Sequence, residues 1–402
     1  MERPPLEVAA IFRQHGEDYR QTHHLGPEQQ KAIRDIETCR TALLGGHIDC
    51  CSHGCGYMAI SYNSCRNRHC PKCQSLKQAK WLEERTERLL PTRYFHLVVT
   101  LPHEMIPLTL FNRKLIFNLL FEAAARALLE FALGYDRLRA QIGFTAVLHT
   151  WDQELNFHPH LHIVATGGGL SQDGSKWISA ANSFLLPVKA LSVIIRAKFA
   201  EALERAFREG RLKGNVPCLG SAAPFERFIR KLRRKKWVVY SKELFNSSKK
   251  AYDYLSRYTH RVAISNHRLT RIEAAKVTFR ARDNLNPGRH RLITLATQDF
   301  ISRFLLHILP VRFVKIRHFG LMASSNAKTK LETARALIGQ QNPGDDHAGA
   351  DVSKETKTWQ ELMHSLTGRD LTICPQCGRG TLVRFKLTDS NHIHSPMIWD
   401  SS

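Results

Sequence analysis

The fold is organised around residues 156–169, which have the sequence NFHPHLHIVATGGG. The apolar run that follows the histidines is closed by three glycines, which predicts a buried strand ending in a turn. Alternate side chains of a strand share a face, so we expect His160 and His162 to project together and Leu161 to point the opposite way. Two imidazoles about 7 Å apart on one rigid face can hold one divalent metal ion. The alternative is a pair of ordinary surface histidines on a half-buried strand.

Composition limits the classes of protein to consider. The 402 residues predict two or three domains, and they include 59 Lys and Arg against 36 Asp and Glu, a net charge of +23. Such an excess predicts a polyanionic partner, above all nucleic acid, with an anionic membrane surface as the alternative. The chain has no apolar run of the roughly 18 residues that a spanning helix needs, and its N-terminus does not resemble a secretory signal. We therefore expect a cytoplasmic protein with no membrane contact and reduced cysteines.

Seven cysteines fall between residues 39 and 73. Two close pairs among them predict a tetrahedral structural zinc site made of Cys51, Cys55, Cys70 and Cys73. The remaining potential ligands would suffice for a second zinc ion, held by Cys39, His47, Cys65 and His69. A small domain with little core would take much of its folding free energy from the metal. The alternative is a cluster of free buried thiols.

Hydrophobic patterning places the histidine strand in a sheet. It predicts strands at 94–101, 144–151 and 158–166, an amphipathic helical region at 105–135 that covers one face of the sheet, and a further helix at 184–212. The strands at 144–151 and 158–166 are joined by a short polar segment and should pair as an antiparallel hairpin. The expected fold class is α+β, a central antiparallel sheet with flanking helices, preceded by a small zinc-binding domain.

Two histidines alone would hold a metal ion loosely, so a third ligand is expected. Gln153 offers a neutral oxygen near the turn of the hairpin, which suits a hard cation such as Mg²⁺. His149 is the alternative, and an all-imidazole set would favour a softer metal. We expect Gln153. A zinc hydrolase would instead use His158, His160 and His162 around an activated water.

A second decisive stretch covers residues 249–261, KKAYDYLSRYTHR, which has neither proline nor glycine and predicts a helix. Tyr254 and Tyr258 are four residues apart, so both phenols lie on one face. Phenols are poor nucleophiles at neutral pH, but nearby cations and a metal-polarised phosphate make their attack feasible. The alternative is that both tyrosines pack at the edge of a core.

Basic side chains gather in three places that we expect to contact DNA. One is the loop beside the cysteines, one is a dense basic run at 224–236 that we expect beside the metal site, and one is the tyrosine helix. The candidates are Arg66, Arg68, Arg230, Lys231, Arg233, Arg234, Lys235, Lys236, Arg257 and Arg261. The alternative for such a run is an ordinary solvated helix face.

Four motifs occur in a characteristic order: NSCRNRHCPKCQ at 63–74, HPHLH at 158–162, YLSRYTHRVAIS at 254–265 and FLLHILPVRFVKIRHFG at 304–320. In that order they resemble the two-tyrosine rolling-circle insertion-sequence transposases of the HUH endonuclease superfamily. The resemblance runs from about residue 30 to about residue 320. One departure is the spacing of Cys51 and Cys55, which have three residues between them where that family more usually has two.

The resemblance implies a function. Mg²⁺ or Mn²⁺ on His160 and His162 would assist Tyr254 or Tyr258 to cut single-stranded or locally opened DNA at transposon ends and target, through a 5′-phosphotyrosine, with Zn²⁺ in a structural role. The tyrosine helix would lie against the metal face of the sheet, and the protein would be bacterial and nucleoid-associated. The alternative is a zinc-finger nucleic-acid-binding regulator without catalysis, which explains the cysteines and the charge but not the paired histidines and tyrosines.

The expected organisation has three parts. Residues 1–90 would form a helical and zinc-binding DNA-recognition domain, 91–322 the HUH-type tyrosine nuclease domain, and 323–402 a linker and C-terminal tail. In that tail, Cys374 and Cys377 form another close pair without a second cysteine pair nearby, and could complete a small zinc site with His392 and His394. The sequence leaves the oligomeric state open.

Overall fold

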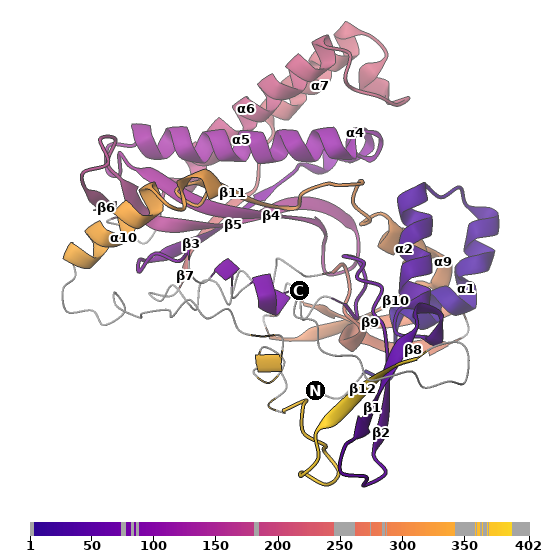
Figure 1. Cartoon of the computed structure of the whole chain (residues 1–402). Helices are drawn as coiled ribbons and strands as arrows, with labels where there is room; N and C mark the ends of the chain where they lie inside the picture. Colours follow the sequence, from indigo (N-terminus) through magenta and orange to yellow (C-terminus); the bar gives the residue numbers. More distant parts are fainter. Residues whose placement is uncertain are drawn as a thin grey trace.

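The computed structural model describes residues 4–73, 78–81, 84, 85, 88–180, 185–244, 262–273, 275–283, 286, 288–341, 358, 360, 361, 364, 368 and 370–387. In these residues, helices combine with one six-stranded and two three-stranded sheets, and the strand pairings are antiparallel (Figure 1). The predicted α+β class is confirmed. Within this described part of the chain, every helix is too short or too polar to cross a membrane.

The largest sheet carries the histidine stretch at its centre. Its strand order is β11-β4-β5-β3-β7, with β6 paired to β5. The strands are β3 (Tyr94–Thr100), β4 (Gln141–Trp151), β5 (Phe157–Leu170), β6 (Trp177–Ser179), β7 (Val239–Leu244) and β11 (Ile316–Gly320). The three predicted strands and the β4–β5 hairpin are confirmed.

The predicted turn at Gly167–Gly169 is wrong, because β5 continues through these glycines to Leu170. A Cβ added at Gly169 would lie 2.3 Å from the Gln141 carbonyl oxygen on β4, and one at Gly168 would lie 2.5 Å from the Ile178 carbonyl oxygen on β6. Glycine is needed here because two neighbouring strands approach the backbone closely.

One face of the sheet is covered by α4 (Ile106–Phe111), α5 (Arg113–Gly134) and α6 (Val188–Arg208), as the predicted helical regions indicated (Figure 1). Alternate residues of β3 and β5, among them Leu97 and Leu161, enter the same core as these helices. Helix α7 (Ala222–Arg234) packs on α6 at the outer side of this layer (Figure 1). The 3-10 turns are η1 (Ala42–Leu44), η2 (His103–Met105), η3 (Pro217–Leu219), η4 (Asn266–Arg268) and η5 (Ser324–Asn326).

The opposite face of the sheet is partly covered by α10 (Lys330–Gln341). Leu331, Ala334 and Ile338 of this helix share a core with Val147 of β4 and Val164 of β5. The prediction that the segment 323–402 begins as a linker is therefore wrong for residues 323–341, whose apolar side chains pack on the sheet. The remaining part of this face carries the histidines.

The N-terminal helices α1 (Val8–Thr22) and α2 (Pro27–Thr38) pack on a distant part of the chain. Their core is shared with β8 (Leu269–Glu273), β9 (Lys276–Arg282), β10 (His290–Ala296) and α9 (Thr297–Leu305). The rings of Phe12 and Phe304 meet edge to face at 5.3 Å. The predicted domain boundary at residue 90 thus cuts across one hydrophobic core.

The third sheet joins the two ends of the chain. Strands β1 (Gly46–Cys51) and β2 (Met58–Tyr62) pair with β12 (Leu382–Leu387), in the order β12-β1-β2 (Figure 1). The register runs from Gly46 opposite Leu387 to Cys51 opposite Leu382. Residues 382–387 are therefore part of the cysteine-rich region, and the expected separate C-terminal tail is wrong for this segment.

Candidate functional site

Three imidazoles meet on the face of the central sheet that the helical layer does not cover. His149 comes from β4 and His160 and His162 from β5, and their nitrogens all lie within 4.8 Å of one another. The Nε2 atoms of His160 and His162 are 3.1 Å apart, whereas Leu161 is buried on the helix side. The prediction that the two histidines share a face is confirmed.

Hydrogen bonds set the ring orientations of this cluster. His160 Nδ1 lies 2.7 Å from the His158 carbonyl oxygen, which can only accept, so Nδ1 carries the proton and Nε2 presents a lone pair. His162 Nδ1 lies 2.9 Å from Nε2 of His96 on β3. When His162 donates to His96, its Nε2 also presents a lone pair toward His160. Two facing lone pairs form the arrangement that binds a cation.

The donor set fits a divalent metal ion. Ligands roughly 2.1 Å from a metal lie roughly 3.0 Å apart in octahedral and roughly 3.4 Å apart in tetrahedral geometry, and the observed 3.1 Å is close to the octahedral value. Burial lowers the pKa of His160 to about 4, which keeps this imidazole neutral at neutral pH. Three imidazoles favour a transition-metal ion over Mg²⁺.

The structure places His149 beside the histidine pair. His149 lies directly opposite His160 in the β4–β5 register. Gln153 follows the end of β4, and its backbone carbonyl accepts a hydrogen bond from Arg268. His158, the third ligand of the hydrolase hypothesis, is exposed and lies outside the cluster.

The cluster has a buried and an open side. His149 is only 2% exposed and stacks on Trp151, with ring centroids 4.6 Å apart. His160 and His162 are half-buried and so partly accessible from solvent. A group that approaches from solvent therefore meets the β5 histidines first.

The predicted nucleophiles Tyr254 and Tyr258 lie outside the described residues, as do Arg257, Arg261, His392 and His394. The described chain before the tyrosines ends with β7, at an edge of the histidine sheet, and it resumes at Val262. The placement of the tyrosine helix against the metal face stays a prediction.

The cysteines form two groups of four that differ from the predicted sets. One group contains Cys39, Cys65, Cys70 and Cys73, and the other contains Cys51, Cys55, Cys374 and Cys377. The predicted set of Cys51, Cys55, Cys70 and Cys73 is therefore divided, because β12 brings a distant cysteine pair to Cys51 and Cys55. His47 pairs instead with Asp49 at 3.5 Å, and Nε2 of His69 accepts the backbone N–H of Leu309 at 3.3 Å.

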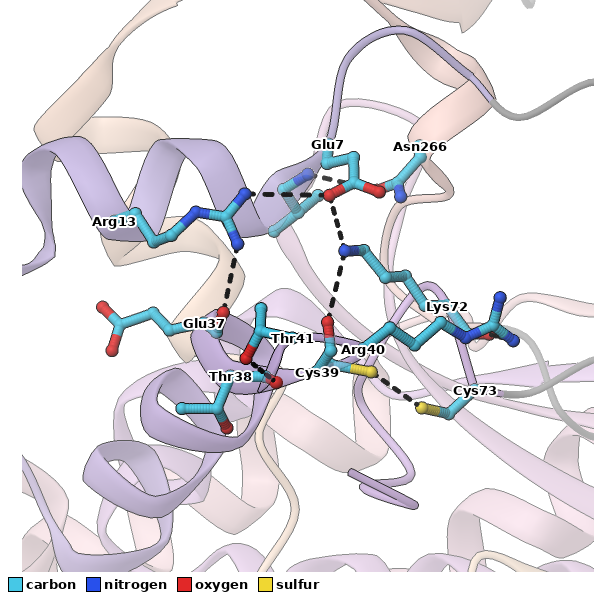
Figure 2. Close-up of polar contacts among 11 residues, drawn as sticks. Glu7, Arg13, Glu37, Thr38, Cys39, Arg40, Thr41, Lys72, Cys73 and Asn266 are labelled. Atoms are coloured by element: carbon cyan, nitrogen blue, oxygen red, sulfur yellow. Dashed lines mark hydrogen bonds and ion pairs between the residues drawn. The ribbon is translucent and has the colours of Figure 1, made fainter. Parts of the chain in front are cut away.

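The first cysteine group fits a structural zinc ion. Cys73 Sγ lies 3.2 Å from that of Cys39 and 3.6 Å from that of Cys65, near the roughly 3.8 Å expected for a tetrahedral zinc tetrathiolate. Lys72 connects this knuckle to the N-terminal helix, since its Nζ contacts the Cys39 carbonyl oxygen and the Glu7 carboxylate (Figure 2). The first cysteine group is thus linked directly to the start of α1, and its buried cysteines share a core with α1 and α2.

The predicted basic surface is only partly available to DNA. Arg68 donates to the carbonyl oxygens of Pro310 and Phe313, at 2.8 and 2.6 Å, and so braces a loop instead of facing solvent. Arg66 is exposed. The basic side chains of α7 are also exposed, but α7 belongs to the helical layer, on the side of the sheet away from the histidines (Figure 1). Their expected position beside the metal site is wrong.

His96, which contacts His162, is not among the residues predicted for the site. It lies in a predicted strand, and its neighbours Phe95 and Leu97 are buried on the helix side. The alternation of strand side chains therefore puts His96 on the histidine face. Its contact with His162 further depends on the pairing of β3 with β5, which the sequence does not specify.

Comparisons with known proteins cover both the cysteine and the histidine regions. A family model described as "Transposase zinc-binding domain" matches residues 11–101, and one described as "Putative transposase" matches residues 143–330. "Putative transposase y4qJ" of Sinorhizobium fredii is 43% identical over 405 residues, covering 100% of both chains. "Transposase for insertion sequence element IS801" of Pseudomonas savastanoi pv. phaseolicola is 26% identical over 339 residues, covering 79% of this chain and 77% of that protein.

Proposed function

This chain belongs to the two-tyrosine family of insertion-sequence transposases, and from that premise we propose that it cuts and rejoins single-stranded DNA through a 5′-phosphotyrosine intermediate. The observation that carries the proposal is the cluster of His149, His160 and His162, whose nitrogens lie within 4.8 Å of one another on a partly open sheet face. Residues 143–330, which match the transposase family, include both these histidines and the two tyrosines.

The three imidazoles would hold Mn²⁺ or Mg²⁺. The bound ion would supply a Lewis acid that draws charge from a phosphate oxygen and orients the phosphate. His160 and His162 offer their Nε2 lone pairs, and His149 is the third ligand. His96 fixes the ring of His162 through its contact at Nδ1, the role of a second-layer partner in metal sites.

Tyr254 or Tyr258 provides the nucleophile. The phenol gives up its proton to solvent and its oxygen attacks phosphorus, the bond from phosphorus to the 3′ oxygen breaks, and the leaving oxygen takes up a proton to become a 3′-hydroxyl. The new phosphotyrosine ester retains the energy of the broken phosphodiester, so a later 3′-hydroxyl can attack it and restore the tyrosine without ATP. Two tyrosines allow one strand end to be held while a second strand is cut.

The substrate would be single-stranded or locally opened DNA at the ends of the element and at its target. The net charge of +23 supports a polyanionic partner. A flexible single strand can bring one phosphate to the half-buried β5 histidines more readily than a rigid duplex can. The exposed Arg66 and the basic side chains of α7 are candidates for contacts along the rest of the DNA.

The test is a search for the covalent adduct. Wild-type protein incubated with Mn²⁺ and a single-stranded oligonucleotide of the element's end, labelled at its 3′ end, should carry label through a denaturing gel. The double variant Tyr254→Phe/Tyr258→Phe should lose the adduct completely. Tyr240→Phe is a matched control, because Tyr240 is an exposed phenol on the same face of the sheet as the histidines. This phenol should be dispensable for the adduct. Label retained by the double variant would contradict the proposal. DNA binding by the wild-type protein without any adduct would favour the alternative of a zinc-finger regulator without catalysis.

The third metal ligand gives a separate prediction. His149→Ala should raise the Mn²⁺ concentration needed for half-maximal cleavage by about tenfold or more, since a ligand near the other two is lost. Gln153→Ala should leave that concentration nearly unchanged, because Gln153 lies beyond the end of β4 and contacts Arg268 through its backbone carbonyl, which alanine retains. Cleavage rates measured across Mn²⁺ and Mg²⁺ titrations of both variants decide whether His149 or Gln153 is the third ligand. A larger shift for Gln153→Ala would restore Gln153 as the ligand.

A further inference from the structure

We propose that a second structural zinc ion, bound by Cys51, Cys55, Cys374 and Cys377, joins the two ends of the chain. The two cysteine pairs are far apart in the sequence, since Cys374 comes 319 residues after Cys55. Cys374 and Cys377 lie beyond the residues that either family model matches. The proposal depends on the cysteines alone and not on the proposed cleavage chemistry.

The sulfur geometry fits zinc better than disulfides. Cys51 Sγ lies 3.6 Å from Cys377 Sγ, and Cys55 Sγ lies 3.6 Å from Cys374 Sγ. A disulfide needs about 2.05 Å, whereas ligands of a tetrahedral zinc tetrathiolate lie roughly 3.8 Å apart. None of the four cysteines forms a disulfide. When Zn²⁺ binds, the four thiols release their protons and become thiolates.

The loops that carry the cysteines are shaped to present sulfur to a metal. The backbone N–H of His53 donates to Cys51 Sγ, and that of Gly380 donates to Cys377 Sγ, both at 3.4 Å. Such N–H donors stabilise negative charge on a thiolate. Gly54 and Gly378 have φ values of +71° and +65°, which glycine adopts without strain where one loop turns just before Cys55 and the other just after Cys377.

The two loops also interlock with each other. The Ser52 backbone N–H donates to the Thr381 carbonyl oxygen at 2.9 Å, and the Thr381 N–H returns a bond to Ser52 Oγ at 3.0 Å. Gln376 Nε2 donates to the Cys55 carbonyl oxygen at 3.2 Å. A Cβ at Gly380 would lie 2.5 Å from Cys51 Sγ, so only glycine fits at this crossing.

The adjoining strands extend the same connection. Strand β12 pairs with β1 over residues 382–387, and Arg384 forms a bidentate ion pair with Asp49, at 2.7 and 3.0 Å. A three-stranded sheet has little core of its own, so a metal at its open end would supply much of its stability. Zinc at this site would therefore hold the C-terminal strand on the N-terminal domain.

The zinc content of purified full-length protein tests the proposal. Wild type should contain two zinc ions per chain, and the double variants Cys374→Ser/Cys377→Ser and Cys51→Ser/Cys55→Ser should each contain one. Cys50→Ser is the matched control and should retain two, because Cys50 neighbours Cys51 in β1 but belongs to neither cysteine group. One zinc in wild type, or two in either double variant, would overturn the proposal.

Gly380→Ala provides a test that removes no ligand. The added Cβ should separate the loops, so one of the two zinc ions should pass to a chelator at least tenfold faster than from wild type, while the other is retained. In the same samples, the amides of residues 382–387 should exchange hydrogen faster. Unchanged zinc release in Gly380→Ala would refute the interlocked site, and neither readout requires DNA or a catalytic metal.

Discussion

Replacing His162 by alanine is expected to abolish DNA strand cleavage while leaving DNA binding largely intact. His162 is the centre of the cluster, since its Nε2 lies 3.1 Å from that of His160 and its Nδ1 lies 2.9 Å from His96. A Lewis acid contributes several kcal/mol to such a reaction, so the single-turnover rate should fall by about 10³ or more. Binding depends on the basic surface and should change little. Cleavage in Mn²⁺ and DNA affinity at the same salt concentration measure the two effects.

Variants of two neighbouring histidines, His158 and His96, are the controls for this prediction. His158→Ala should cleave normally, because the hydrogen bond to His160 is accepted by the backbone carbonyl of residue 158, which alanine retains. His96→Ala should need about ten- to a hundredfold more metal and recover at saturation, as expected for a residue that orients a ligand. Equal losses of binding and cleavage in His162→Ala would instead show that the histidines are structural.

The histidine pair could be predicted because the two-residue period of a strand fixes which side chains share a face. The third ligand could not, because it depends on the register between two strands. Gln153, Trp151 and His149 have the same parity in sequence, so parity alone does not separate the expected Gln153 from the alternative His149. The structure has a register shift between β4 and β5 at His149 and Trp151, and β4 ends at Trp151, so Gln153 lies outside the paired strand. The sequence carries no clear signal for such an irregularity.

The zinc ligands show a different limit of sequence analysis. The close pairs at Cys51, Cys70 and Cys374 are visible as local spacing, and each indicates a metal knuckle. Which knuckles share an ion is decided by tertiary structure, here by the pairing of β12 with β1. Local spacing therefore predicts one site for the neighbouring pairs Cys51/Cys55 and Cys70/Cys73, although these pairs belong to two different cysteine groups. A helix start has local signals instead, and α2 begins at Pro27, a residue type that is favoured at the first helical position.

Cys73→Ser should remove the zinc ion of the first cysteine group and unfold much of residues 39–73. Cys39, Cys70 and Cys73 are buried in the core that holds α1 and α2, so losing the metal should also loosen those helices. Structural zinc sites contribute about 10 kcal/mol or more to folding, and a site opened by one lost thiolate should forfeit several kcal/mol of that. Zinc content and thermal unfolding measure the change, and DNA affinity should fall with the loss of the folded domain.

Cys218→Ser is the matched control for this prediction, because Cys218 is also partly buried but lies in η3, outside both cysteine groups. It should keep its zinc content, thermal stability and DNA affinity. The two zinc sites can be separated in the same experiment, since Cys73→Ser should keep the ion held by Cys374 and Cys377. A Cys73→Ser protein with full zinc content and wild-type DNA affinity would contradict the assignment. Loss of zinc with unchanged DNA affinity would show instead that the first zinc site stabilises the fold without forming part of the DNA-binding surface.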